Sequence, residues 1–184
     1  MFLPREPILT RRLRLEPVAP SHAEPLWEAI DASLPELRPW MGWAQNVSLE
    51  STREFAAGAE QRWDFDVALE YVVFAAQEQS SPLGTVGLHL KHNLPRSDIG
   101  YWMRSDHTRR GYTTEAASAL LDLAFTTLGN FRVELRAGAA NIASRRVAEK
   151  LGFRQEGRLR AACLGAYGMY DCYIYGLLAT DSRP

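Results

Sequence analysis

The order of predicted strands and helices constrains the fold of this chain most strongly. Arg12 to Glu16 alternate between charged and apolar side chains, which predicts a half-buried strand over residues 8–17. The further predicted strands are 69–76, 85–92, 98–104, 131–137, 153–160 and 167–178. The predicted helices are 21–33, Ser48 or Ser51 to about 63, 111–128 and 141–151. Interleaved strands and helices with several short turns indicate an α/β (α+β) fold, with a mixed, mostly antiparallel twisted sheet flanked by helices.

Length and charge narrow the function classes. A chain of 184 residues is typical of one domain, so residues 1–184 are expected to form a single unit. Lys and Arg number 21 and Asp and Glu number 22, which gives a net charge of −1. A nearly neutral chain is not typical of a protein that binds nucleic acid or an anionic membrane over a broad basic surface.

The same inspection gives an expected location. No apolar run reaches the ~20 residues of a membrane span, and no secretory signal is visible at the start. Cys163 and Cys172 have a spacing that matches neither a disulfide framework nor a zinc site, so no metal is expected. We therefore expect a cytoplasmic protein with reduced thiols.

A basic segment between a predicted strand and a predicted helix is the first candidate site. Residues 104–114 read Arg-Ser-Asp-His-Thr-Arg-Arg-Gly-Tyr-Thr-Thr. The unpaired N–H groups of a helix start, together with Arg109 and Arg110, favour a bound phosphate. The sequence lacks the glycine pattern of a P-loop or a dinucleotide fold. A solvated basic loop with ordinary helix capping is the alternative.

Four stretches of the sequence resemble one superfamily over nearly the whole chain. They are Arg-Leu-Arg-Leu-Glu-Pro from Arg12, Asp-Ile-Gly-Tyr-Trp-Met from Asp98, the basic loop up to Glu115, and residues 141–153 with Asp171 and Tyr175 beyond. The pattern is similar to the GNAT superfamily of acetyl-CoA-dependent N-acetyltransferases, in particular the RimJ/RimL branch that acetylates ribosomal proteins. This resemblance implies a GNAT fold and acetyl-CoA as cosubstrate.

The resemblance also implies residues that hold acetyl-CoA. The residues expected to bind the pyrophosphate are Arg109, Arg110, Gly111, Tyr112, Thr113 and Thr114. The main chain of Met103 and Arg104 is expected to pair with the pantetheine amides, and Asn141 and Ser144 to lie at the thiol end. Two positions depart from the pattern, because Thr113 replaces a smaller residue and Arg109 stands where many members have glycine.

Two catalytic roles follow from the same comparison. Asp98 occupies the position of a glutamate that takes the amine proton, either directly or through water. Ser144 is expected to bond the sulfur of the leaving group, because Ala148 replaces the tyrosine that many members use. A main-chain N–H near Met103 would stabilise the oxyanion. Asp98 as a turn residue and Ser144 as an ordinary helix residue are the alternatives.

Aromatic residues mark the expected acceptor pocket. Trp40 and Trp43 are interpreted as one wall, and Tyr170, with Tyr167 and Tyr173 near it, as the opposite wall. Simple core packing would explain the same pattern. His89 and His92 have no partner motif and are interpreted as ordinary strand or turn residues.

The predicted activity is transfer of an acetyl group to a primary amine. By the RimJ/RimL resemblance the acceptor is a protein N-terminal α-amine. Two alternatives stay open. One is a small-molecule amine such as a polyamine, an aminoglycoside or a metabolite, and the other is a CoA-binding sensor with little activity. A homodimer is a further expectation from related proteins.

Overall fold

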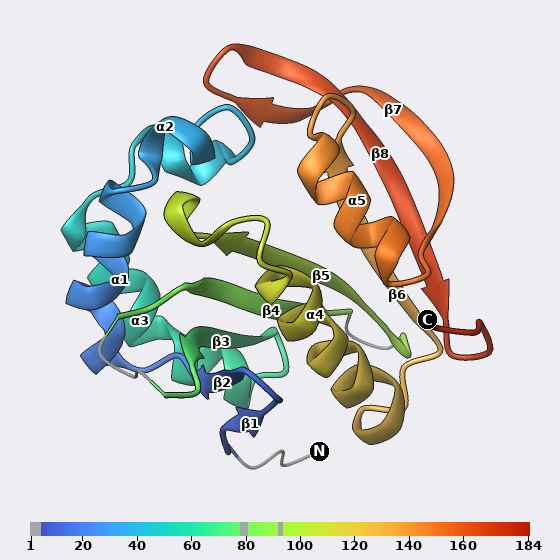
Figure 1. The fold of residues 1–184 in the computed structure, drawn as a ribbon, viewed down its shortest axis with the longest axis horizontal. Helices are drawn as coiled ribbons and strands as arrows, with labels where there is room; N and C mark the ends of the chain where they lie inside the picture. Colours follow the sequence, from blue (N-terminus) through green and yellow to red (C-terminus); the bar gives the residue numbers. More distant parts are fainter. Residues whose placement is uncertain (1–4, 78–80, 92–93) are drawn as a thin grey trace.

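Eight strands form one sheet in the computed structural model, which describes residues 5–77, 81–91 and 94–184 (Figure 1). The strand order is β1-β2-β3-β4-β5-β6-β8-β7, and every neighbouring pair is antiparallel except β5 and β6. The strands are β1 (Ile8–Leu9), β2 (Leu13–Pro17), β3 (Ala68–Ala75), β4 (Gly84–Leu90), β5 (Arg96–Met103), β6 (Arg132–Gly138), β7 (Arg154–Gly165) and β8 (Gly168–Leu178). The expected mixed sheet is confirmed.

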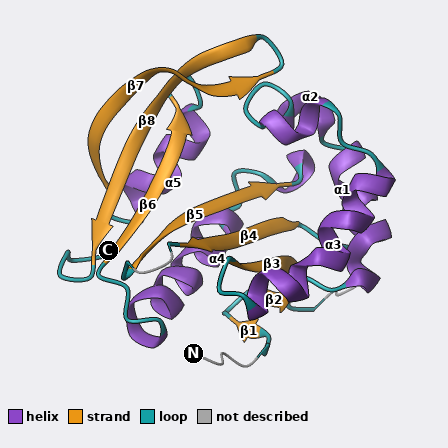
Figure 2. Cartoon of the chain, turned by 180° about the vertical axis from the view of Figure 1, so that it is seen from behind, coloured by secondary structure: helices purple, strands orange, loops and turns teal. Residues whose placement is uncertain are grey.

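Helices cover both faces of the sheet (Figure 2). The α-helices are α1 (Ala23–Asp31), α2 (Leu34–Leu37), α3 (Leu49–Asp64), α4 (Tyr112–Asp122) and α5 (Ile142–Lys150). The shorter turns are η1 (Pro20–His22), η2 (Gly42–Gln45), η3 (Ser105–His107) and the π-helical η4 (Leu123–Thr127). None of the helices in the described part of the chain is long and apolar enough to cross a membrane.

Two apolar cores lie on opposite faces of the sheet. Leu120 and Leu121 of α4 pack with Leu135 of β6 in the larger core, which also includes residues of α5. The smaller core joins α1 and α3 to the other face, where Leu26 and Ala56 pack with Val72 of β3. Alternating strand residues therefore supply both cores, as expected for a sheet covered on both faces.

The parallel contact between β5 and β6 is short. Only Arg96–Asp98 pair with Arg132–Glu134, and the two strands then separate. Figure 1 shows β6 continuing beside β8 while β5 continues beside β4. The sheet is thus split along half its length, and this split positions the site described below.

Two predictions made from the sequence are wrong. The strand predicted over residues 8–17 is a hairpin, in which Ile8 pairs with Leu15 after a turn at Thr10. The predicted reduced thiols are also wrong, because Cys163 and Cys172 form a disulfide with their Cα atoms 6.0 Å apart. In the β7–β8 pair Cys163 lies opposite Tyr170 and Cys172 opposite Leu159, with a register shift between the two pairs. The disulfide joins the two strands of this hairpin, a placement that spacing along the chain does not reveal.

Two of the predicted helices begin with a side-chain cap at or next to the predicted first residue. Ser48 accepts a hydrogen bond from the Ser51 N–H at 3.2 Å, and Asn141 accepts one from the Ser144 N–H at 3.1 Å. Asp98 lies within β5 and not in the preceding turn, so its reading as a turn residue is wrong. His92, the last residue of the strand predicted over 85–92, lies outside the described residues.

Candidate active site

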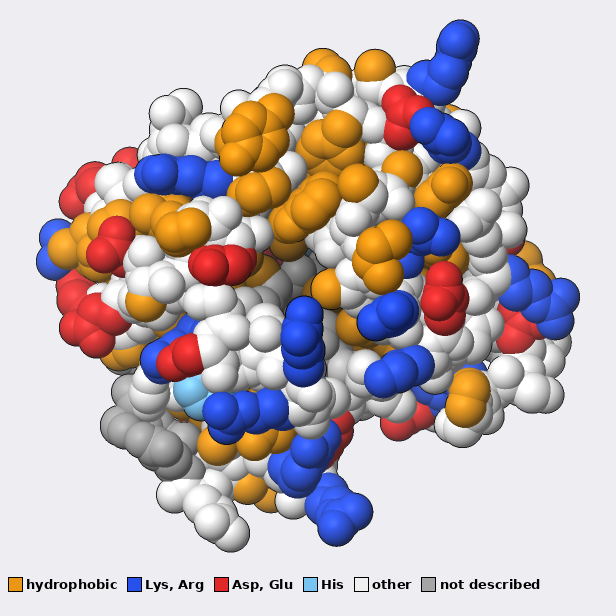
Figure 3. All heavy atoms as spheres, turned by 45° about the horizontal axis from the view of Figure 1, so that its top comes forward, with side chains coloured by type: hydrophobic (Ala, Val, Ile, Leu, Met, Phe, Trp, Pro, Cys, Tyr) orange, Lys and Arg blue, Asp and Glu red, His pale blue; other side chains and the backbone are white. Residues whose placement is uncertain are grey.

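A cavity of about 700 Å³ lies over the split in the sheet. Its wall includes α1 and α3 residues, the loop around Trp40, three central strands and the start of α5. Figure 3 shows hydrophobic side chains gathered beside a hollow in this face of the molecule. A largely apolar cavity with a few polar groups is the usual form of a small-ligand site.

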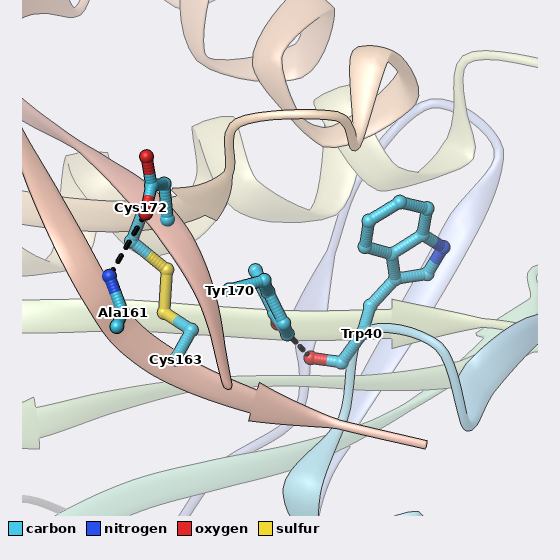
Figure 4. The surroundings of a disulfide bond; sticks show 6 residues. Trp40, Ala161, Cys163, Tyr170 and Cys172 are labelled. Carbon is cyan, nitrogen blue, oxygen red and sulfur yellow. Dashed lines mark hydrogen bonds between the residues drawn. A yellow bond between two sulfur atoms is a disulfide. The ribbon is translucent and has the colours of Figure 1, made fainter. Parts of the chain in front are cut away.

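Three of the five aromatic residues interpreted as pocket walls line this cavity: Trp40, Trp43 and Tyr170. Trp40 and Tyr170 meet edge to face with ring centroids 6.0 Å apart, and the Tyr170 hydroxyl donates to the Trp40 carbonyl at 2.6 Å (Figure 4). The ring centroids of Trp43 and Trp102 are 6.3 Å apart. Tyr167 and Tyr173 are not in the lining, and Tyr167 is 92% exposed.

The tip of the β7–β8 hairpin closes one side of the cavity. The Ala166 N–H donates to the Arg38 carbonyl at 2.9 Å, and a Cβ on Gly165 would collide with the Pro39 carbonyl oxygen. Glycine at 165 therefore permits the close approach of hairpin and loop. Cys163 lines the same cavity, and its disulfide to Cys172 ties the two strands of the hairpin (Figure 4).

Asn141 and Ser144 line the cavity at the start of α5. The Ser144 hydroxyl is 3.1 Å from the Tyr101 hydroxyl, and Tyr101 also donates to the Ser144 carbonyl at 3.3 Å. Tyr101 comes from β5, on the far side of the split. Sequence reasoning missed this phenol, because nothing local links residues 43 positions apart.

Burial raises the pKa of the Tyr101 phenol to about 12, with a smaller opposing effect from its Ser144 hydrogen bond. The phenol therefore stays protonated at neutral pH. A thiol has a pKa of about 8.5, so proton transfer from Tyr101 to a leaving thiolate is uphill by roughly 3.5 pK units. Tyr101 and Ser144 are accordingly suited to donating hydrogen bonds and poorly suited to donating a proton.

The main-chain groups of β5 differ in what they can still bind. The Arg104 N–H donates to the Leu83 carbonyl at 2.7 Å, and the Arg104 carbonyl accepts from the His107 N–H. Main-chain direction alternates along an antiparallel strand, so the neighbouring Met103 N–H points away from β4 toward the split. Met103 therefore keeps a donor for a ligand in the split, whereas Arg104 does not.

The basic loop leads into the start of α4, where the main-chain geometry suits an anion. The N–H groups of Tyr112, Thr113 and Thr114 precede the first helical hydrogen bond, which Glu115 makes with Gly111. Gly111 has φ 79° and Arg109 has φ 61°, both in the left-handed region. The resemblance places glycine at position 109 in many relatives, and this backbone conformation supplies the physical reason.

An ion pair that the sequence did not reveal anchors this loop to β2. The Arg12 Nε lies 2.6 Å from Glu115 Oε2, and Arg12 Nη1 donates to the Arg110 carbonyl at 2.9 Å. The Arg12 guanidinium also lies 4.8 Å from the Tyr112 ring centre. Partial burial acts to raise the pKa of Glu115, but hydrogen bonds from Thr10 and Arg12 outweigh it and lower that pKa.

Asp98 and His89 are opposite each other on β5 and β4. Asp98 Oδ2 forms an ion pair with Lys91 at 2.6 Å, while Oδ1 is buried without a hydrogen-bond partner among the described residues. His89 lines the cavity and Asp98 does not. Gly100 leaves space beside this imidazole, since a Cβ there would lie 3.7 Å from His89 Nε2. His89 is therefore a second candidate base that sequence reasoning set aside.

No group of three His, Cys, Asp or Glu residues within the described ranges could hold a metal ion. The arrangement instead provides an anion site at α4, a split strand pair with free main-chain donors, two hydroxyls and an apolar cavity. These parts suit an elongated anionic ligand along the split and a second ligand in the cavity.

Known proteins are similar to this chain in sequence and in fold. A family model described as "Acetyltransferase (GNAT) domain" matches residues 12–154. "Putative ribosomal N-acetyltransferase YdaF" of Bacillus subtilis is 30% identical over 88% of this chain and 88% of its own. "Ribosomal-protein-serine acetyltransferase" of Escherichia coli is 27% identical over 84% and 86%. The crystal structure of RimL, a ribosomal L7/L12 α-N-protein acetyltransferase with coenzyme A, superposes with a TM-score of 0.86 at 22% identity, covering 94% and 97%.

The chain belongs to the GNAT acetyltransferase family. It is an N-acetyltransferase, and the expected cosubstrate, acetyl-CoA, is that of the family. The geometry is compatible with this ligand, because the start of α4 suits a phosphate and the cavity contains the hydroxyls of Ser144 and Tyr101. The sequence-based assignment of the family is confirmed.

Proposed function

We propose that this protein transfers the acetyl group of acetyl-CoA to the N-terminal α-amine of a protein. The observation that carries the proposal is the cavity, which meets the split strands at Ser144 and Tyr101. The names of the ribosomal relatives support the choice of acceptor. A cytoplasmic location agrees with such an acceptor, and a homodimer stays a prediction.

Proton chemistry favours an α-amine. Its pKa is about 8 against about 10.4 for a lysine side chain, so deprotonation at pH 7 costs about 3.3 kcal/mol less. The neutral nitrogen attacks the thioester carbonyl, the C–S bond breaks, and the amine proton passes to a base. In this proposal the Met103 N–H stabilises the oxyanion and Ser144 bonds the departing sulfur; the direction of the Met103 N–H and the position of Ser144 in the cavity lining support these roles.

The base is Asp98 or His89. Asp98 Oδ1 is buried and open to a hydrogen bond, whereas His89 has direct access to the cavity. Asp98 remains our assignment, acting directly or through a water molecule. The variants Asp98→Asn and His89→Gln distinguish the two candidates. Only the variant that lacks the base is expected to have a kcat lowered by about 100-fold or more, and only in that variant should the acid limb of the pH profile change.

The proposed acceptor is tested by supplying acetyl-CoA with short peptides that differ only in a free or blocked N-terminus. Release of free CoA is followed, and the product is located by mass spectrometry. Acetylation at the α-amine of the free peptide is expected. A polyamine and an aminoglycoside serve as comparison acceptors, and faster turnover of either one than of every peptide would overturn the proposal.

A further inference from the structure

The side chains of Glu70 and Arg136 line the acceptor cavity, in addition to the imidazole of His89. Glu70 and Arg136 differ in whether they have a partner of opposite charge. Glu70 is bonded by Arg62 at 2.7 Å, and the Arg62 guanidinium stacks 4.8 Å from the Phe55 ring centre. Arg136 has no hydrogen bond or ion pair with the described residues. The cavity therefore carries one neutralised carboxylate and one guanidinium that is open to a ligand.

The neighbours of Arg136 on β6 explain why it is unpaired. Glu134, two residues earlier on the same face, is occupied by Arg132 at 3.0 Å and Arg96 at 3.5 Å. Opposite Arg136 on β8 stands Ile174, which offers no charge. The lack of a partner follows from the fold, because the nearest carboxylate along the strand already has two cations.

Arg136 also lies beside the aromatic wall. Gly138, two residues further along the same face, is so close to Tyr170 and Trp40 that a Cβ there would lie 2.8 Å and 3.2 Å from their rings. Residues two apart on a strand are about 6.6 Å apart along its axis. An acceptor packed against these rings therefore extends within reach of the guanidinium, which is exposed at the cavity edge.

We propose that the acceptor carries a carboxylate close to its amine, and that Arg136 binds this carboxylate. The inference rests on the proposed N-terminal acetylation and adds a preference for an acidic residue just behind the acetylated one. A guanidinium forms two parallel hydrogen bonds with a carboxylate, which an amide cannot match. The lack of any free carboxylate in the lining argues equally against a polycationic acceptor.

The test compares two peptides that begin Ser-Glu or Ser-Gln and are otherwise identical. We expect kcat/KM to be about tenfold higher for the acidic peptide, a ratio equal to about 1.4 kcal/mol. In Arg136→Gln the two peptides become equivalent, while the KM for acetyl-CoA is unchanged. Arg154→Gln is the matched control, because Arg154 is an exposed arginine that pairs with Asp181 outside the cavity lining.

Each outcome separates the two proposals. Equal rates for both peptides in the wild type overturn the carboxylate preference and leave N-terminal acetylation standing. A higher KM for acetyl-CoA in Arg136→Gln assigns the guanidinium to the donor and also overturns it. Free glutamate as acceptor tells whether the carboxylate belongs to a peptide or to an amino acid. Failure of every peptide defeats the proposed function itself.

Discussion

The contact between Tyr101 and Ser144 gives the sharpest test of the site. A neutral hydrogen bond contributes about 0.5–1.5 kcal/mol, which corresponds to roughly a 2- to 13-fold change in rate. Tyr101→Phe removes the bond that orients the Ser144 hydroxyl 3.1 Å away and should cost this amount in kcat. Ser144→Ala removes the group that meets the sulfur and should cost about tenfold or more.

The double variant decides whether the two hydroxyls act together. If Tyr101 works by orienting Ser144, Tyr101→Phe has almost no effect once Ser144 is alanine, and the coupling energy equals the Tyr101→Phe loss. Single-turnover release of CoA is the suitable assay. Tyr173→Phe, which removes a phenol outside the cavity lining, is the control. An equal loss from Tyr101→Phe in both backgrounds would refute the reasoning.

The pH profile provides an independent check on the same residue. Because burial raises the pKa of Tyr101 to about 12, its phenol stays protonated throughout the usual assay range. The ratio of kcat between the wild type and Tyr101→Phe should therefore be constant from about pH 7 to about pH 10. A ratio that falls toward one within this range would show that the phenol ionises.

Three further predictions concern the loop and the hairpin. Arg109→Gly should raise the free energy of unfolding by about 1 kcal/mol by relieving the left-handed backbone, and Arg109→Gln should not. Calorimetry should show weaker acetyl-CoA binding in both variants, and unchanged binding would remove the anion role. Because the pKa of Glu115 is lowered in the folded state, its contribution to stability is present above its unfolded pKa of about 4.3 and is lost as pH falls through the folded value. Urea unfolding should therefore show Glu115→Gln to be less stable than the wild type at pH 7 and nearly equal to it at low pH, and a pH-independent difference would contradict this. Reduction of the Cys163–Cys172 disulfide should lower the free energy of unfolding by roughly 2–3 kcal/mol. A Cys163→Ser variant should show no response to reductant, and a wild type equally indifferent to reductant would argue against the bond.

Local patterns in the sequence determined most elements because they act over a few residues. The caps at Ser48 and Asn141 each bond an N–H three residues on, so their chemistry is visible in the chain itself. The apolar spacing of α4 likewise predicts its buried face, which includes Leu120 and Leu121. The hairpin at Thr10 was not predicted, although local hydrogen bonds between Thr10 and Leu13 close its turn; the Thr10 hydroxyl also donates to Glu115, 105 residues away.

The family and the anion loop were thus available from the sequence by itself, since contiguous residues carry them. The tertiary structure alone decided how the site is assembled. It placed Tyr101 beside Ser144, Tyr170 against Trp40, Arg12 on Glu115 and the two cysteines together. The physical reason is that side chains far apart in sequence come into contact only when the strands have paired and β5 and β6 have separated. No local sequence pattern encodes these long-range contacts.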